Sequence, residues 1–194
     1  MPVSSLLYGK TIGIIGGGQL GRMMGTALKH MGYRLIVLDP TPDCPAAQLA
    51  DEQIVAKYDD LEAIKQLREK TDVVTYEFEN VDLEAARYLE AEGVLPQGAK
   101  SLEITQDREK EKQAMLDSHQ PVSPFQIVTS EKELDEAIET IGLPAVVKTC
   151  RGGYDGKGQV KLKSKENLPA VHEMLERGER LIYEAFVSFD CEIS

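Results

Sequence analysis

The chain has 194 residues, of which 42% are hydrophobic and 28% charged, a composition typical of a globular protein with a buried core. Its formal net charge of −11 argues against a general binder of nucleic acid or anionic membranes, because the mean field repels phosphate. Cys44, Cys150 and Cys191 form no C-x-x-C pair, so neither a disulfide framework nor a zinc site is indicated, and a reducing cytoplasm is expected.

The first half of the chain alternates short apolar strands with amphipathic helices. The expected strands are residues 11–15, 34–38, 53–56 and 72–76, and the expected helices are residues 19–31, 60–70 and 83–92. Apolar strands separated by helices in this way are typical of a parallel sheet that is covered on both faces. The fold class predicted for this half is therefore α/β.

The pattern changes near Pro96, and we expect a domain boundary within residues 96–120. A polar helix is predicted at 106–118, after which prolines interrupt the chain. The later strands are expected at residues 125–128, 144–149, 159–163, 180–187 and from Cys191 onward, and the later helices at 131–141 and around 168–175. The last residues resemble the middle of a strand, so we expect the chain to be a fragment.

A glycine-rich turn follows the first predicted strand. Residues Gly16 to Gly21 satisfy G-x-G-x-x-G at the start of a predicted helix, whose free N–H groups favour an anion. Asp39 ends the next strand, about where dinucleotide sites place an acid that binds ribose. The turn therefore fits an NAD-dependent oxidoreductase, a site for a different phosphate, or a tight connection that binds nothing.

Three polar residues, Glu77, Glu79 and Asn80, follow the strand at 72–76. The carboxyl ends of parallel strands face the ligand crevice of an open sheet, where acids can hold sugar hydroxyls or position an amine. Acids are also favoured at a helix N-terminus without any ligand. The sequence leaves both interpretations open.

A group of cations between residues 148 and 165 is the strongest indication of function. Six cations against one acid, Asp155, give this stretch a charge of +5 in a chain of net charge −11; the cations are Lys148, Arg151, Lys157, Lys161, Lys163 and Lys165. The glycines between them let backbone N–H groups face phosphate oxygens. A hairpin with solvated lysines is the alternative, but it accounts poorly for Lys148, which interrupts an apolar strand.

These segments together resemble the ATP-grasp superfamily, and within it the carboxylases of aminoimidazole ribonucleotide. The resemblance spans the whole chain and rests on KTIGIIGGGQLGRMM (10–24), VVTYEFENV (73–81), TQDREKEK (105–112), VVKTCRGGYDGKGQ (146–159) and YEAFVSFDCEIS (183–194). It implies a Rossmann-like parallel-sheet domain (1–96), a helical connector (97–120), the small α+β lid domain of an ATP-grasp fold (121–187) and the start of a C-terminal grasp domain (188–194). Most of that last domain would be missing, because members of the family are longer.

The resemblance also implies roles for individual residues. Gly18, Gln19 and Leu20 would hold the 5′-phosphate of the ribonucleotide, and Glu77 would face the same substrate. The implied ATP-binding residues are Arg108, Lys148, Gly153, Tyr154, Asp155, Gly156, Lys157, Gly158, Gln159, Glu184, Ala185, Phe186, Val187 and Glu192. Tyr154, Asp155 and Lys157 would also lie near bicarbonate and take the catalytic part.

The implied reaction is the ATP-dependent carboxylation of 5-aminoimidazole ribonucleotide by bicarbonate, through carboxyphosphate, in purine biosynthesis. Its product would be N5-carboxyaminoimidazole ribonucleotide. A formate-dependent glycinamide ribonucleotide transformylase and a non-catalytic nucleotide-binding module are the alternatives. We further expect Mg²⁺ as a cofactor, with its ligands in the missing part of the protein, and no nucleic-acid or membrane partner. The full-length protein is expected to be a cytoplasmic homodimer. This chain on its own is expected to be inactive.

Overall fold

The computed structural model of the protein describes residues 9–153 and 158–191. The chain forms two compact units, Met1–Glu103 and Ile104–Ser194. Among the described residues, no helix combines the length and the apolar character needed to cross a membrane.

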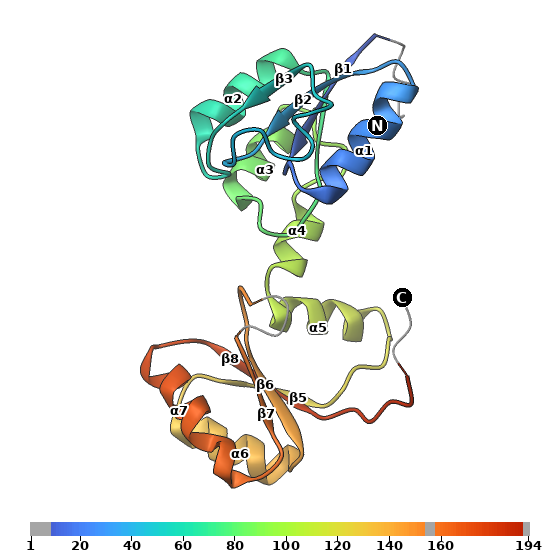
Figure 1. Ribbon diagram of the computed structural model, residues 1–194. Coiled ribbons are helices and arrows are strands. Elements are labelled where there is room, and N and C mark those ends of the chain that lie inside the picture. The colour runs from blue at the N-terminus through green and yellow to red at the C-terminus, as the bar shows by residue number, and fades with distance from the viewer. Residues whose placement is uncertain (1–8, 154–157, 192–194) are drawn as a thin grey trace. The chain divides into compact units, whose positions relative to one another are not determined.

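The first unit is built on a parallel sheet with the strand order β3-β2-β1-β4. Its strands are β1 (Thr11–Ile15), β2 (Arg34–Leu38), β3 (Glu52–Ile54) and β4 (Val73–Tyr76), and its helices are α1 (Gln19–His30), α2 (Leu61–Lys70) and α3 (Leu83–Ala91). Helix α4 (Lys100–Thr105) spans the boundary between the two units. Ile14 of β1 packs with α1, whereas its neighbour Ile15 belongs to the cluster with α2 and α3. Helices therefore cover both faces of the sheet, as predicted (Figure 1).

Parallel pairing brings the carboxyl ends of β1, β2 and β4 to one edge of this sheet. In the register of the strands, Ile15 of β1 lies beside Leu38 of β2 and Tyr76 of β4. The glycine-rich turn, Asp39 and Glu77 are the residues that follow these three strand ends. Three sequence features that are far apart along the chain thus meet at the same edge.

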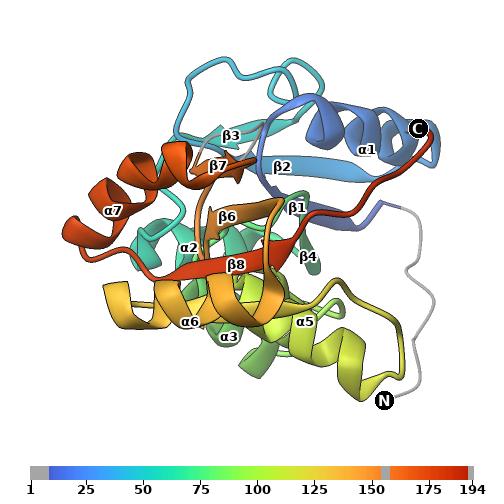
Figure 2. The same ribbon diagram turned by 90° about the horizontal axis from the view of Figure 1, so that it is seen from below.

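The second unit is built on an antiparallel sheet with the order β5-β8-β6-β7. Its strands are β5 (Phe125–Val128), β6 (Ala145–Thr149), β7 (Gln159–Leu162) and β8 (Leu181–Ala185), and its helices are α5 (Arg108–Asp117), α6 (Glu131–Ile141), the short 3-10 helix η1 (Lys165–Asn167) and α7 (Leu168–Glu176). Val147 and Tyr183 lie in the buried cluster that α6 and α7 cover. Since side chains alternate along a strand, Lys148 and Glu184 lie on the face opposite this cluster. Helices α6 and α7 can be followed beside this sheet in Figure 2.

Helix α4 and the end of β8 differ from the sequence-based expectation. Helix α4 was not predicted, because six residues are too few to establish a helical period. The strand expected at 180–187 ends at Ala185. The N–H of Ala185 still bonds the Pro124 carbonyl and that of Phe186 bonds the Pro144 carbonyl, but neither proline has an N–H to extend the ladder.

Candidate functional site

The glycine-rich turn between β1 and α1 already holds an internal anion. Gly18 is the N-cap of α1 and has no side chain to cap it, but the carboxylate of Glu77 does so from the end of β4. Glu77 Oε1 accepts the Gly18 N–H at 3.1 Å, and Oε2 accepts the Gly21 N–H. A Cβ at Gly16, where φ is +103°, would lie 2.5 Å from Glu77 Cγ, so the turn requires glycine there.

Asp39 does not serve as a free acid for ribose. Its side chain is buried, and it accepts hydrogen bonds from the Gly17 N–H at 2.7 Å, the Thr41 N–H at 2.8 Å and the Tyr58 hydroxyl at 2.8 Å. Burial, and then the bond to Asp39, raise the pKa of Tyr58. With both oxygens engaged and a carboxylate already on the turn, the geometry disfavours a dinucleotide site.

The expected substrate residues of this unit lie together at the edge of the sheet. Gly18 and Glu77 bond each other, while Gln19 and Leu20 are exposed in the first turn of α1. The N–H groups of Gln19 and Leu20 have no acceptor within the described part of the chain, as is usual in a first helical turn. The turn can therefore present N–H donors and the Glu77 carboxylate to one polar ligand.

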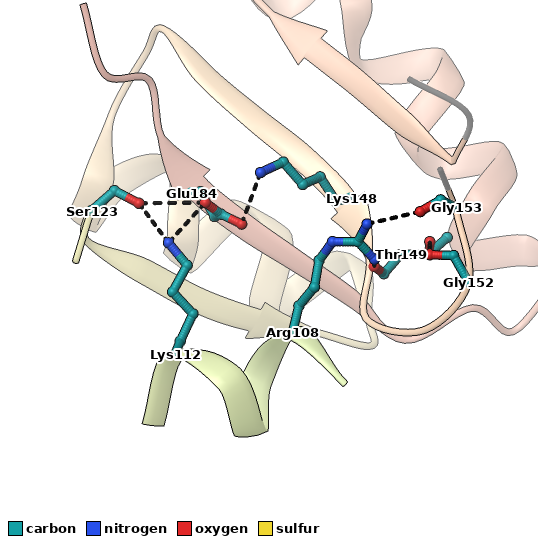
Figure 3. A network of polar contacts seen from close by, with 8 residues as sticks. All are labelled: Arg108, Lys112, Ser123, Lys148, Thr149, Gly152, Gly153 and Glu184. Carbon is teal, nitrogen blue, oxygen red and sulfur yellow. Dashed lines mark hydrogen bonds and ion pairs between the residues drawn. The ribbon is translucent and has the colours of Figure 1, made fainter. Parts of the chain in front are cut away.

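In the second unit, the carboxylate of Glu184 on β8 is held by three side chains from three different segments (Figure 3). Lys148 of β6 reaches Oε1 at 3.2 Å, and Lys112 of α5 reaches Oε2 at 3.0 Å. Ser123 accepts a hydrogen bond from Lys112 at 2.8 Å and donates one to Oε2 at 3.3 Å. We call Glu184, Lys112, Lys148 and Ser123 the Glu184 network.

The Glu184 network carries one positive charge in excess. Burial on its own raises the pKa of Glu184, but the hydrogen bond from Lys112 and the charges of both lysines outweigh it, so the pKa lies below the usual value. The carboxylate is therefore ionised at neutral pH and neutralises one of two ammonium groups. The remaining charge, on the sheet face opposite the apolar cluster, suits an anionic ligand.

Arg108, at the start of α5, holds the backbone of the glycine-rich loop that follows β6. Its guanidinium donates to the carbonyls of Thr149 at 2.7 Å, Gly152 at 2.9 Å and Gly153 at 3.0 Å. The loop closes on β6, where the Thr149 N–H bonds the Gly158 carbonyl at 2.9 Å. Both cations that were expected to bind phosphate, Arg108 and Lys148, thus have partners within their own unit.

A second set of contacts fixes α5 beside the sheet. Arg180 pairs with Asp107 and Glu109, and the Arg108 N–H bonds the Cys150 carbonyl at 2.9 Å. Burial raises the pKa of Cys150 to about 11, so its thiol is protonated at neutral pH. These contacts keep Arg108 and Lys112, one helical turn apart, on the same side of α5.

The other residues expected to bind ATP are placed as follows. Gln159 pairs with Lys148 between β7 and β6, and Ala185 ends β8. Phe186 and Val187, expected at the adenine hinge, are 42% and 57% exposed. Five expected residues lie outside the described part of the chain: Tyr154, Asp155, Gly156, Lys157 and Glu192.

Sequence reasoning missed Lys112 and Ser123, because a lysine in a polar helix is usually solvated and a serine beside proline usually belongs to a loop. The i, i+4 spacing from Arg108 to Lys112 was the signal that could have identified Lys112. No group of three or more His, Cys, Asp and Glu side chains is placed to hold a metal ion in residues 9–153 and 158–191.

Family models match both units. The ribonucleotide synthetase preATP-grasp domain matches residues 9–106, and the ATP-grasp domain matches residues 113–194. A curated N5-carboxyaminoimidazole ribonucleotide synthase from Bacillus subtilis is 49% identical over 186 residues, which cover 96% of this chain and 49% of that protein. The chain spans about half the length of the curated relatives that it matches.

Solved structures give the same result. An N5-carboxyaminoimidazole synthetase from Staphylococcus aureus complexed with ADP has a TM-score of 0.92 at 44% identity, covering 95% of this chain and 49% of that one. An N5-carboxyaminoimidazole synthase from Aspergillus clavatus, in complex with ADP and 5-aminoimidazole ribonucleotide, has a TM-score of 0.83 at 25% identity, covering 94% and 48%. A glycinamide transformylase T from Mycobacterium tuberculosis shares the fold, with a TM-score of 0.71 at 22% identity.

Proposed function

Because the chain belongs to the ribonucleotide synthetase preATP-grasp family, we propose that it is part of a carboxylase that uses ATP and bicarbonate to convert 5-aminoimidazole ribonucleotide to its N5-carboxy derivative. Bicarbonate oxygen would attack the γ-phosphorus of ATP, releasing ADP and forming carboxyphosphate. The exocyclic amine would then attack the carboxyl carbon, expelling phosphate and losing a proton. The curated and solved relatives at 44–49% identity carry the name of this reaction.

The second unit would bind ATP, and the Glu184 network is the observation that carries this proposal. Phosphoryl transfer requires mainly positioning and charge neutralisation, and the network offers a surplus ammonium group on a defined strand. Lys148 would exchange Glu184 for a phosphate oxygen, and Arg108 would exchange loop carbonyls for another. Glu184 to Val187 would then face the adenine.

The first unit would bind the ribonucleotide at the edge of its parallel sheet. Gln19 and Leu20 would donate their N–H groups to the 5′-phosphate, since the N-terminus of a helix favours an anion. Glu77 would accept hydrogen bonds from ribose hydroxyls while it stays on the Gly18 N–H. Mg²⁺, which the resemblance implies, would have its ligands in the part of the relatives that this chain does not span.

A fusion of this chain to the part of the Bacillus subtilis relative that it does not match tests the proposal. We expect ADP release that requires both bicarbonate and 5-aminoimidazole ribonucleotide, and little release from the chain alone. The fusion carrying Lys148→Met should lose this activity, while the exposed-lysine control Lys165→Met keeps it. The assignment would be overturned if formate and glycinamide ribonucleotide drive ADP release. It would also be overturned if the parent fusion releases no more ADP than its Lys148→Met variant.

Cytoplasmic location and assembly as a homodimer remain predictions from the resemblance. Sedimentation of the fusion at micromolar concentration measures its oligomeric state directly.

NADH fluorescence should not change on addition of the chain, because Asp39 and the glycine-rich turn are internally bonded.

A further inference from the structure

Two lysines share the carboxylate of Glu184, but they hold it unequally (Figure 3). The ammonium of Lys112 contacts Glu184 Oε2 at 3.0 Å and Ser123 Oγ at 2.8 Å, and it lies 5.8 Å from the centroid of the Phe125 ring. Its side chain is 18% exposed. Lys148 is 28% exposed, and its ammonium contacts Glu184 Oε1 at 3.2 Å with no second partner among the described residues.

We propose that Lys112 is a positioning residue that stays on Glu184 and thereby lets Lys148 move to the phosphates of a nucleoside triphosphate. This inference rests on the proposed function, because it assumes that Lys148 binds ATP. Lys112 does not touch the nucleotide in this account. It acts through Glu184, whose charge it neutralises whether Lys148 is present or not.

Glu184 needs a second cation because it is buried, with 7% of its surface exposed. A buried carboxylate that loses its last cation is strongly destabilised, whereas one that loses one of two cations is still paired. When Lys148 leaves, Oε2 keeps the Lys112 ammonium and the Ser123 hydroxyl. Without Lys112, transfer of Lys148 would leave the carboxylate with a single neutral donor, so Lys148 would be retained by Glu184.

Lys112 is not needed to attach α5 to the unit. The pairs of Arg180 with Asp107 and Glu109, and the bond from the Arg108 N–H to the Cys150 carbonyl, hold the start of this helix independently. Removing the Lys112 ammonium should therefore leave Arg108 in place. A loss of ATP affinity in a Lys112 variant would then report the charge on Glu184.

The first test uses this chain without nucleotide. Lys112→Met is expected to lower the urea midpoint of unfolding more than Lys148→Met does, because Lys148 is the more exposed and less bonded partner. In a Glu184→Gln background the excess cost of Lys112→Met over Lys148→Met should shrink, since the buried charge is gone and only the Ser123 bond and the Phe125 contact of Lys112 remain. Equal losses with Glu184 intact, or a larger loss for Lys148→Met, would overturn the inference.

The second test measures ATP binding to the fusion described above by titration calorimetry. We expect Lys112→Met to weaken binding by about tenfold or more, and Lys112→Arg to stay within about threefold of the parent protein. In the Glu184→Gln background, Lys112→Met should have no further effect on the dissociation constant. Lys165→Met is the matched control for loss of one exposed positive charge.

A spectroscopic measurement separates the two lysines. On addition of ATP, the side-chain nitrogen resonance of Lys148 should shift strongly, and that of Lys112 should shift much less, because Lys112 stays on Glu184. A parent fusion that binds no ATP would overturn the proposed function, and the release of Lys148 with it. ATP binding that is unaffected by Lys112→Met, or is reduced as much in the Glu184→Gln background, would overturn the role of Lys112 alone.

Discussion

Replacing Glu77 with alanine removes the internal anion from the glycine-rich turn. Two N–H groups, those of Gly18 and Gly21, lose their acceptor at the N-terminus of α1. Loss of a helix cap costs about 0.5–2 kcal/mol, and loss of a favourable charge at the helix dipole costs about 0.3–1 kcal/mol. Because Glu77 is only half-buried and water can replace part of these bonds, we expect a loss of about 1–2 kcal/mol.

Urea unfolding of Glu77→Ala and Glu77→Gln measures this loss. Glu77→Gln keeps one acceptor oxygen and should lose less than Glu77→Ala. Inorganic phosphate should stabilise Glu77→Ala more than the parent chain, because the two vacated N–H groups can then donate to the anion and binding to the folded state adds stability. An unchanged unfolding free energy, or equal stabilisation of both proteins by phosphate, would refute the account of the turn.

Three further predictions concern the second unit. The pKa of Glu184 is depressed in the folded state, so its ionised form contributes stability above the ordinary glutamate pKa. That contribution is lost as the pH falls through the folded-state pKa. Glu184→Gln should therefore flatten the acid side of a plot of melting temperature against pH. Cys150 should resist a thiol reagent at neutral pH, because burial raises its pKa to about 11, while the exposed Cys191 reacts; equal labelling rates would contradict this. Tyr183→Phe should cost about 1 kcal/mol in urea unfolding, because the buried hydroxyl donates to the Gly142 carbonyl at 2.8 Å, and a neutral result would mean that water replaces that bond.

The secondary structure of both units was largely predictable because its signals are local. Apolar runs separated by glycine turns marked β1, β2 and β4, and the apolar positions of α6 follow a helical period with Ser130 as the N-cap. The Ser130 hydroxyl accepts the Glu133 N–H and so caps the start of this helix. The end of β8 was not predictable, because it depends on the prolines that immediately precede β5 and β6 rather than on its own residues.

By itself, the sequence of this protein determined which residue types occur where a phosphate site is expected: glycines after β1 and β6, and cations in a chain of net charge −11. Only the tertiary structure decided which groups pair. Glu77 reaches the Gly18 N–H across 59 residues, and Lys148 reaches Glu184 across 36. Such pairs depend on strand register and on the face that each side chain occupies, and local periodicity encodes neither the partner nor the distance.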